Sequence, residues 1–549
     1  MNLEQRVNDL LPAFQARLRA FAFGPELDQS AAQMLKLLES QRRRRADTTD
    51  RLRLKALALM AEYLDAHGRS QEAASLLKLT VAELLDGGMG GDPKLMRQQV
   101  WCCLAYALTH LRANRTREAG KIIIQMRLYA ATKLVSPEFP CHGTLALLRY
   151  YEGLWHRNTG DLNSAARDFD EALEQARLRY DEKKQKYEKL DPDRLRRELV
   201  YSRVMTARIL GFGHGGIALA RGRYIEARGW MTSASLILSS LGQETWRRGL
   251  EVYARSSAVM LAEWQTSSLS ENAARLRELE AWFTPRNSRN AFIAGAFAIL
   301  AELRIRQIES GSVLKMDLKG LRNRLDACLR TAYRDSGPLS ATATLYLIEC
   351  LLRAEDFTRC QKELDRFEKA FEGEEEVMAE FRVLQAELWL RTGRQSAARA
   401  TLQALVQQMV AHRGYRARAW ALLAWSEKEA GQSIWADRAI HAATQALDAV
   451  QDGSARAMVK EIATIVNTTV ELKLAMPYQG DASSWCNLDH NLEMAKLNVV
   501  ATVHARYPSY NVDQLAAAMG RGVSWLYALL GKHRDLDWVA QILSPTRST

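Results

Sequence analysis

The fold is decided by residues 147–176, which read LLRYYEGLWHRNTGDLNSAARDFDEALEQA. Gly160 lies in the middle of this stretch. Because glycine tolerates the positive φ at which many helices end, Gly160 predicts the end of a helix and a tight turn. Small residues stand on both sides of the turn, Gly153 seven residues before it and Ala165 five residues after it.

These positions resemble a tetratricopeptide repeat, in which two antiparallel helices meet at a tight turn. In that family small residues, here Gly153 and Ala165, permit close contact between the two helices. An aromatic residue, here Phe169, fills the space between units, and Ala172 completes the match. The resemblance implies that this stretch is one helical hairpin of a longer array.

The same spacing recurs along most of the chain with less fidelity. The further pairs of turn residue and small residue are Gly68 with Ala73, Asn114 with Ala119, Gly222 with Ala227, Ser268 with Ala273, Glu355 with Cys360, Gly393 with Ala398, and Gly431 with Ala436. Turns 68, 114 and 160 lie 46 residues apart, and turns 393 and 431 lie 38 apart, whereas the family period is about 34. We expect helices roughly one to three turns per pair longer than the family's, as in arrays that resemble the sensor superhelix of the large maltose-type transcription activators.

The composition favours an all-α fold, an α-α superhelix of tetratricopeptide-like hairpins. The chain has 549 residues, 47% of them hydrophobic, but only 11 prolines and 31 glycines, which suits helices and argues against a β-sandwich or barrel. A formal net charge of +12 permits an anionic partner, but arginines on solvated outer faces of helices are the favoured explanation.

Seven cysteines without a CxxC pair are predicted to be reduced and packed as small hydrophobic residues. The amino-terminal sequence is amphipathic and lacks a secretory signal pattern, and no uncharged apolar stretch reaches about 18 residues. We expect a cytoplasmic protein without a membrane span.

The predicted domains are an N-terminal helical cap over 1–50, a repeat solenoid over 51–475, a linker over 476–488 and a C-terminal module over 489–549. Within the solenoid, a charged insertion at about 178–200 predicts a solvated helical extension that bends at Pro192. Residues 315–340 interrupt the rhythm, and another helical pair is expected there.

No constellation of residues predicts catalysis. A GxxxxGK[ST] phosphate loop is absent from the sequence, and GFGHGG at 211–216 belongs to a predicted repeat helix rather than to a strand–helix turn. Cys486 and His490 are only two candidate ligands, whereas structural zinc takes four. We expect no enzyme activity, no cofactor and no metal. The inner face of a curved array predicts a site for a peptide, a protein or a small ligand.

The C-terminal stretch NVDQLAAAMGRGVSWLYALLGKH, residues 511–533, predicts a second kind of site. Asn511 can cap a short helix, and Gly520 supplies a sharp turn before a third helix. A longer helix precedes them and stops at Pro508. This order is that of a helix-turn-helix.

The stretch resembles the DNA-binding end of the factor-for-inversion-stimulation family. The matching residues are Asn511, Ala516, Ala517, Met519, Gly520, Leu526, Tyr527 and Leu530. The resemblance implies a module that dimerises and places its last helix in the major groove. The candidates to face base edges are Ser524, Trp525, Ala528 and Lys532, and the candidates to contact phosphates are Arg521 and Arg534.

This module also departs from the family. Tyr527, Ala528 and Leu529 stand where the family carries several arginines or lysines. From residue 485 to the end there are six Lys and Arg residues against five Asp and Glu residues, little positive charge for a phosphate-binding module.

Two functions follow. One is a bacterial transcriptional regulator that senses a protein, peptide or small ligand through its array and binds double-stranded DNA. The family that its C-terminal stretch resembles implies a homodimer. The alternative is a non-enzymatic adaptor in which the C-terminal helices cap the solenoid or dock a partner.

Overall fold

A computed structural model describes most of the chain. The described residues are 9–12, 14–15, 25–41, 50–67, 69–112, 115–134, 141–188, 192–261, 266–312, 314, 317–333, 338–371, 375–408, 414–448, 450–467, 497, 500, 504, 511–519, 522–532, 539 and 543. All regular secondary structure within these ranges is helical, which confirms the all-α prediction. The chain forms two compact units, Met1–Ala475 and Met476–Thr549.

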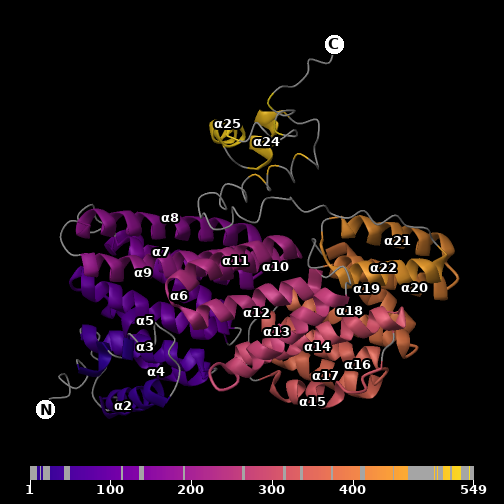
Figure 1. Cartoon of the computed structure of the whole chain (residues 1–549), viewed down its shortest axis with the longest axis horizontal. Coiled ribbons are helices and arrows are strands. Elements are labelled where there is room, and N and C mark those ends of the chain that lie inside the picture. Colours follow the sequence, from indigo (N-terminus) through magenta and orange to yellow (C-terminus); the bar gives the residue numbers. More distant parts are fainter. Residues whose placement is uncertain are drawn as a thin grey trace. The chain divides into compact units, whose positions relative to one another are not determined.

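The larger unit is an array of antiparallel helical hairpins (Figure 1). The hairpins, after α2 (Pro25–Gln41), are α3 (Arg51–Ala66) with α4 (Ser70–Glu83), α5 (Pro93–Arg112) with α6 (Thr116–Tyr129), α7 (His142–Asn158) with α8 (Leu162–Tyr187), α9 (Pro192–Arg208) and α10 (Gly215–Ala220) with α11 (Tyr224–Ser240), α12 (Glu244–Leu261) with α13 (Thr266–Phe283), α14 (Ser288–Ser310) with α15 (Arg322–Thr331), α16 (Pro338–Arg353) with α17 (Phe357–Phe371), α18 (Glu375–Arg391) with α19 (Gln395–Gln408), and α20 (Tyr415–Glu429) with α21 (Ser433–Leu447). The helix α22 (Gly453–Val466) follows, and short π-helical turns occur at η1 (Leu84–Gly88), η2 (Ala130–Leu134) and η3 (Ile209–His214).

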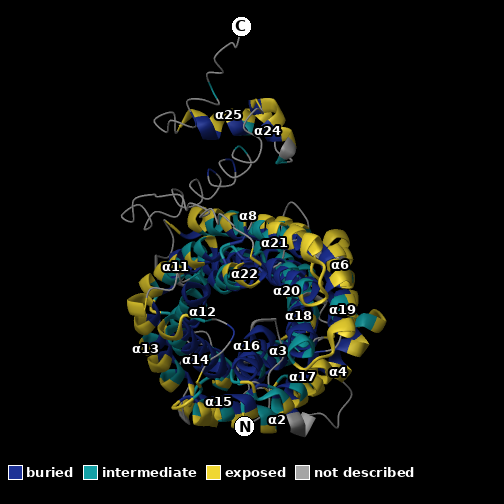
Figure 2. Ribbon diagram, turned by 90° about the vertical axis from the view of Figure 1, so that its right-hand side faces the viewer, coloured by how far each residue is buried: buried dark blue, intermediate teal, exposed yellow. Residues whose placement is uncertain are grey.

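The two helices of each hairpin occupy different layers of the larger unit. Figure 2 shows α12, α14, α16, α18, α20 and α22 toward the inside of the curve, with α13, α15, α17 and α19 outside them. Each of these first helices contacts the next first helix in the series, so they form a continuous inner wall. Buried residues predominate on the inner layer and exposed residues on the outer one (Figure 2).

The predicted turn residues adopt the expected backbone conformation at most described positions. Gly160, Gly222, Gly393 and Gly431 have φ between +69° and +82°, and Glu355 has φ +59°, all in the left-handed region. An alanine pays a steric cost in that region that a glycine does not, which is why the turns could be read from the sequence.

The predicted turn at Ser268 is wrong. Helix α13 begins at Thr266, so Ser268 lies within its first turn. Serine carries no requirement for positive φ, and serine near a helix start is favourable, so the spacing alone misplaced this turn. Gly68 and Asn114 lie outside the described residues.

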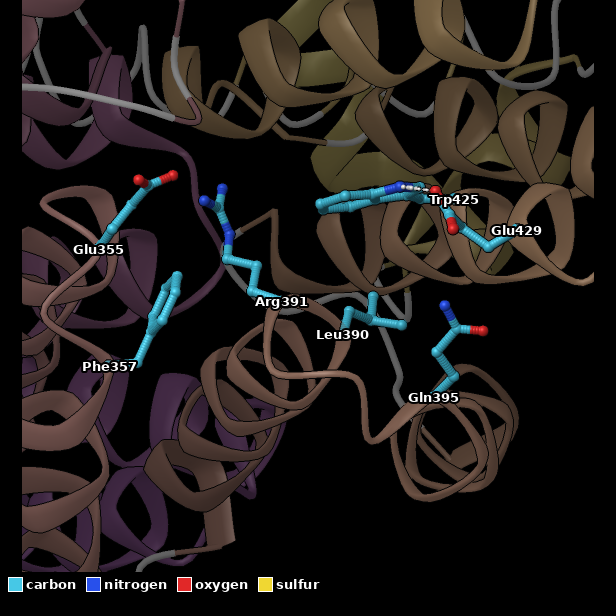
Figure 3. A pocket seen from close by; sticks show the side chains of 7 residues that line it. All are labelled: Glu355, Phe357, Leu390, Arg391, Gln395, Trp425 and Glu429. Atoms are coloured by element: carbon cyan, nitrogen blue, oxygen red, sulfur yellow. Dashed lines mark hydrogen bonds between the residues drawn. The ribbon is translucent and has the colours of Figure 1, made fainter.

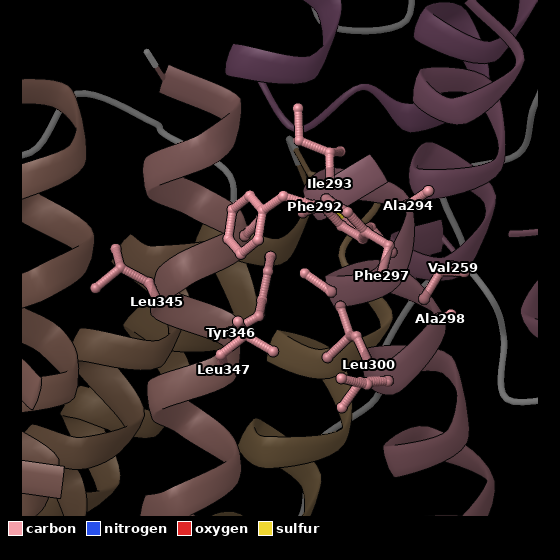
Figure 4. Packing of buried hydrophobic residues seen from close by; sticks show 14 of the residues in the cluster. Val259, Phe292, Ile293, Ala294, Phe297, Ala298, Leu300, Leu345, Tyr346 and Leu347 are labelled. Atoms are coloured by element: carbon pink, nitrogen blue, oxygen red, sulfur yellow. The ribbon is translucent and has the colours of Figure 1, made fainter. Parts of the chain in front are cut away.

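Close packing around Phe169 confirms the prediction made for the opening hairpin. Phe169 on α8 is fully buried, and a Cβ atom added at Gly153 would lie 2.5 Å from its Cε1 atom. The aromatic ring therefore occupies the space that the glycine leaves on α7. Elsewhere the core continues from unit to unit, as Figure 4 shows where Phe292 and Phe297 of α14 pack beside Tyr346 of α16.

The charged insertion is part of two paired helices. Helix α8 continues to Tyr187, and Pro192 is the first residue of α9, where its fixed φ is favourable. Arg179 of α8 donates to Glu198 Oε2 at 2.6 Å and to Ser202 Oγ at 2.9 Å, which holds α8 against α9. The extension is therefore helical, and it packs against α9 at Arg179 while Lys184, Gln185 and Lys186 remain exposed. GFGHGG spans the end of η3 and the start of α10, within helical structure as predicted.

Residues 315–340 contain one short helix, α15, in their described part, and α16 begins at Pro338. The helical pair expected within this region is therefore wrong for its described part, because α15 pairs with α14, which ends before the region begins. The six described cysteines are free and buried, as predicted; Cys486 and His490 lie outside the described residues.

The array curves far enough for α22 and the residues before it to contact α11 and α12. The Gln451 amide donates to the Gly222 carbonyl at 3.1 Å, and Gln451 Oε1 accepts from the Ile225 amide at 3.0 Å. Helix α12 also contacts α22. Residues more than two hundred positions apart thus close the curve between α11 and α22.

The smaller unit contains α24 (Val512–Ala518) and α25 (Val523–Gly531), which pack against each other. Asn511 caps α24 as predicted: its side chain accepts from the Gln514 amide at 2.9 Å, and the Gln514 side chain accepts from the Asn511 amide at 3.0 Å. The buried cluster of this unit consists of Leu497, Val500, Val512, Leu515, Ala516, Leu526, Leu529, Leu530 and Val539. The proposed linker 476–488 and the turn residue Gly520 lie outside the described residues.

Candidate functional site: a groove beside a buried ionic network

A groove runs along the turn edge of three consecutive hairpins. Its cavity measures about 350 Å³, and its lining residues are Glu355, Phe357, Leu390, Arg391, Gln395, Trp425 and Glu429 (Figure 3). These residues come from the ends of α18 and α20, the starts of α17 and α19, and the turn after α16. The repeated hairpin turn thus places two aromatic, one cationic and two acidic side chains around one opening.

Arg391 is the central polar group of this groove. Its side chain is only 6% exposed, and its Nη2 atom donates to the Leu314 carbonyl at 2.9 Å and to Glu387 Oε1 at 3.2 Å. The Cζ atom lies 5.9 Å from the centre of the Trp425 ring, within the range of a cation–π contact. Its buried Nε atom has no acceptor among the described residues.

The flat wall of the groove is the indole of Trp425. Its Nε1 atom donates to Glu429 Oε1 at 3.2 Å, which fixes the ring orientation (Figure 3). Phe357 and Glu355 lie on the other side of Arg391 (Figure 3). The groove offers an apolar face on either side of a buried guanidinium.

Behind the groove, Arg391 belongs to an ionic network on the inner wall. Glu387 accepts from Arg353 and Arg391, and its Oε2 atom lies 3.8 Å from Arg418 Nη2. The second carboxylate, Glu349, accepts from Arg353 Nη2 at 3.0 Å and has two further guanidinium groups within 3.6 Å, those of Arg304 and Arg418. All of these side chains are at least nine-tenths buried.

The network keeps both carboxylates ionised. Burial by itself would raise the pKa of Glu387, but Arg353, Arg391 and Arg418 together hold it below its ordinary value. The pKa of Glu349 is likewise lowered, because Arg418, Arg304 and Arg353 outweigh the effect of burial. A buried ion pair of this kind fixes geometry more reliably than it adds stability.

One carboxylate nearby behaves differently. Asp452 caps α22 by accepting from the amides of Ser454 and Ala455, at 2.9 and 3.0 Å. Burial raises its pKa despite these two bonds and the nearby Arg418 and Arg304 guanidinium groups.

The sequence contains a signal for this site in charged residues that repeat with the period of the turns. Glu387 and Arg391 repeat the Glu349 and Arg353 pair 38 residues earlier, the same distance that separates the turns 355, 393 and 431. Charged residues in phase with a repeat occupy equivalent places on successive helices. In the next repeat these places hold Trp425 and Glu429, both of which line the groove.

The residues predicted to bind DNA are only partly brought together. Ser524 and Ala528 are exposed one turn apart on α25, and Lys532 is exposed just after it. Trp525 is half-buried and packs against the cluster of the smaller unit. Arg521 and Arg534 lie outside the described residues.

No protein-family model matches the chain, and no curated protein matches it. A similar solved structure is a Rap protein complexed with Competence and Sporulation Factor, at 10% identity and a TM-score of 0.41, covering 76% of this chain and 98% of that chain. Another is the APC/C hetero-tetramer Cut9–Hcn1, at 13% identity and a TM-score of 0.28, covering 79% of this chain and 86% of that chain. The assignment of this chain to the helical-repeat solenoids rests on its own hairpins and turns.

Two absences concern the described residues alone. Within them, no group of three or more His, Cys, Asp or Glu side chains is arranged to hold a metal ion. None of the helices in the same ranges combines the length and the apolar character needed to cross a membrane.

Proposed function

We propose that this protein is a non-enzymatic adaptor that binds an extended segment of a partner protein at the groove around Arg391. The observation that carries the proposal is the Arg391 guanidinium, whose Nε has no acceptor among the described residues and which lies between Trp425 and Phe357 in the groove (Figure 3). Peptides supply what such a groove requires, since their carbonyl oxygens accept hydrogen bonds and their side chains cover apolar faces.

The volume and polarity of the groove favour a peptide. A space of about 350 Å³ holds one or two large side chains. The carboxylates of Glu355 and Glu429 border the opening, so a basic residue of the partner next to an apolar one would be favoured. No pair of lining residues is arranged as a nucleophile with its base, in keeping with binding rather than catalysis.

Selection from a random peptide library displayed on phage, with the full chain as target, tests the proposal. Selected peptides are then measured by fluorescence anisotropy against two tryptophan variants. Trp425→Ala should weaken binding at least ten-fold, about 1.4 kcal/mol. Trp435→Ala is the matched control, because Trp435 is 57% exposed and does not line the groove, and it should leave binding unchanged.

Gln395→Trp is a second variant that removes no buried contact. Gln395 is exposed at the rim, so a tryptophan there should fill the groove and block binding without unfolding the chain. Failure to select any peptide, or equal binding by all variants, would refute the proposal.

We propose DNA binding by the smaller unit as a second candidate function. The capped α24 and the exposed Ser524, Ala528 and Lys532 favour it. The same face of α25 presents Val523 and Tyr527, the latter 50% exposed, and these side chains suit a protein partner better than phosphates. A homodimer would be needed for two such helices to reach successive major grooves.

Anisotropy of a labelled mixed duplex with the full chain separates the two candidates. DNA binding predicts a complex at low salt that weakens steeply at 200 mM salt. The double variant Arg521→Ala with Lys532→Ala should then lower the affinity and flatten the salt dependence. Absence of binding at low salt would remove this candidate and leave the adaptor.

A further inference from the structure

We propose that the chain's own loop between α14 and α15 occupies the inner face of α18, α20 and α22 as a tethered ligand, and that a partner peptide must displace it. The inference deepens the proposed function, on which it rests, by naming what the peptide resembles and how access is controlled. The loop comprises residues 311–320, of which 312, 314 and 317–320 are described beside the turn residue Gly311.

The loop leaves α14 and is held first by α22. Gly311 has φ +70°, which ends α14 and redirects the chain. Ser312 Oγ then donates to Glu461 Oε1 on α22 at 2.8 Å, and it accepts from the Leu314 amide at 3.1 Å. The first of these bonds joins residues 149 positions apart, so it is a tertiary contact and not a local turn.

Leu314 is then inserted into the core of the last repeats. It lies outside any helix but is only 8% exposed, and it joins the buried cluster built from α18, α19, α20, α21 and α22. Its carbonyl accepts the 2.9 Å hydrogen bond from Arg391 Nη2. A leucine that packs in this way is not part of the hairpin pattern, and its burial must come from binding to a face that the helices leave available.

Together these contacts have the pattern of peptide recognition. A hydroxyl is bound by Glu461, a backbone carbonyl by Arg391, and an aliphatic side chain by the apolar inner wall. Three contacts of this kind can recognise a short segment, because the backbone hydrogen bonds supply affinity and the side-chain pocket supplies specificity. The structure assigns the partner as a short segment with serine two residues before leucine.

The groove of Figure 3 and the loop meet at Arg391. The same guanidinium lines the open groove and binds the Leu314 carbonyl. A partner that takes the place of the loop on Arg391 therefore extends directly into the groove beside Trp425. One residue connects an occupied inner face to an accessible surface.

The size of the effect follows from the tether. A short flexible tether keeps its end at an effective concentration on the order of millimolar, so even a weak loop contact competes with a free peptide. If the loop is seated about nine-tenths of the time, the apparent affinity for a partner falls about ten-fold. Releasing the loop should raise the apparent affinity for the partner about ten-fold.

The test uses a fluorescein-labelled copy of residues 309–320, ESGSVLKMDLKG, titrated with the full-length chain. Leu314→Asp in the chain removes the seated side chain and should bind the peptide about ten-fold more tightly than the wild type. Ser312→Ala, which removes only the contact with Glu461 and does not disturb the core, should raise the affinity about three- to four-fold, because the loss of one hydrogen bond lowers the seating constant of the loop from about nine to about two. Adding Arg391→Ala to either variant should abolish the gain.

Two controls isolate the loop. A peptide with aspartate in place of the leucine that corresponds to Leu314 should not bind any variant. Leu79→Asp in the chain, at a leucine of α4 that is 56% exposed, introduces the same charge far along the array and should leave the affinity at the wild-type value.

The outcomes separate this inference from the proposed function. Equal binding of the loop peptide to the wild type, Ser312→Ala and Leu314→Asp would overturn the tethered-ligand inference. If peptides selected from the random library still bind the groove with wild-type affinity in Leu314→Asp, the adaptor function survives that result. If neither the loop peptide nor any selected peptide binds, both are refuted.

Discussion

The contact between Gly153 and Phe169 allows a quantitative prediction, because it forms the first recognisable hairpin. We predict that Gly153→Ala destabilises the α7–α8 hairpin, although alanine is the better helix former. Inside a helix this change contributes about 1 kcal/mol in favour of folding. The new Cβ atom, however, would lie 2.5 to 2.9 Å from three atoms of the Phe169 ring, roughly an ångström inside normal contact.

The ring cannot easily move away from the added methyl group. A Cβ atom at Gly213 would likewise lie only 2.9 Å from Phe169 Cδ1, so α7 and η3 both approach the ring closely. Overpacking of this kind costs about 1–3 kcal/mol, and the confined ring favours the upper end. Subtracting the gain in helix propensity leaves a net loss of about 2 kcal/mol.

Amide hydrogen exchange of α7 and α8 in the intact chain measures this loss locally, since repeat arrays open unit by unit. A loss of about 2 kcal/mol corresponds to exchange about thirty-fold faster. Gly249→Ala in α12 is the matched control: the nearest atom to its Cβ would be Asn290 Nδ2 at 3.4 Å, so exchange in α12 should slow. If Gly153→Ala also slowed exchange in α7, the packing argument would be wrong.

Three further predictions concern the buried groups. Glu387→Gln should cost about 3–5 kcal/mol, seen as a lower melting temperature, because it removes a charge shared by buried arginines. The pKa of Glu387 is lowered in the folded state, so its ionised carboxylate stabilises the fold above the unfolded pKa of about 4.3. This stabilisation is lost as the pH falls through the folded pKa. Melting curves from pH 7 to pH 3 should show the loss in the wild type and not in the variant. Burial raises the pKa of Cys103 to about 12, and the other described thiols are buried too. A thiol reagent at pH 8 should therefore modify at most one cysteine per chain before the chain unfolds. Rapid modification of several cysteines in the folded chain would contradict the fold. Gln451→Ala leaves the Ile225 amide without its acceptor and should cost about 1–2 kcal/mol, measured as faster exchange in α11, whereas Gln451→Glu keeps an acceptor and should show little change.

The turns of the array were predictable because a left-handed backbone conformation restricts the residue type. The turn glycines can therefore be recognised in the sequence, and their spacing indicates antiparallel hairpins. They are Gly160, Gly222, Gly393 and Gly431. Ser268 fits the same spacing but obeys no such restriction, and there the prediction failed. The class of fold is predictable from the sequence because positive φ at the turns restricts the residue type to glycine or a few others.

The candidate site was not predicted. Arg391 is one of many arginines on helices, and its role depends on a carbonyl at Leu314, 77 residues earlier. The Glu387 and Arg391 pair, four residues apart, has the pattern of an ordinary surface ion pair, and only tertiary packing buries it. Contacts between distant segments carry no local signal, so the loop on the inner wall could not be found from spacing or periodicity.

The central claim is that an extended segment binds where Leu314 now lies, beside Arg391. Photo-crosslinking tests it directly, with a copy of residues 309–320 in which a benzophenone amino acid replaces the leucine, added to the full-length Leu314→Asp chain. After irradiation and digestion, mass spectrometry should locate the adducts in α18, α20 and α22, and excess unlabelled loop peptide should suppress them. Adducts scattered over the outer helices, or confined to the smaller unit, would contradict the account.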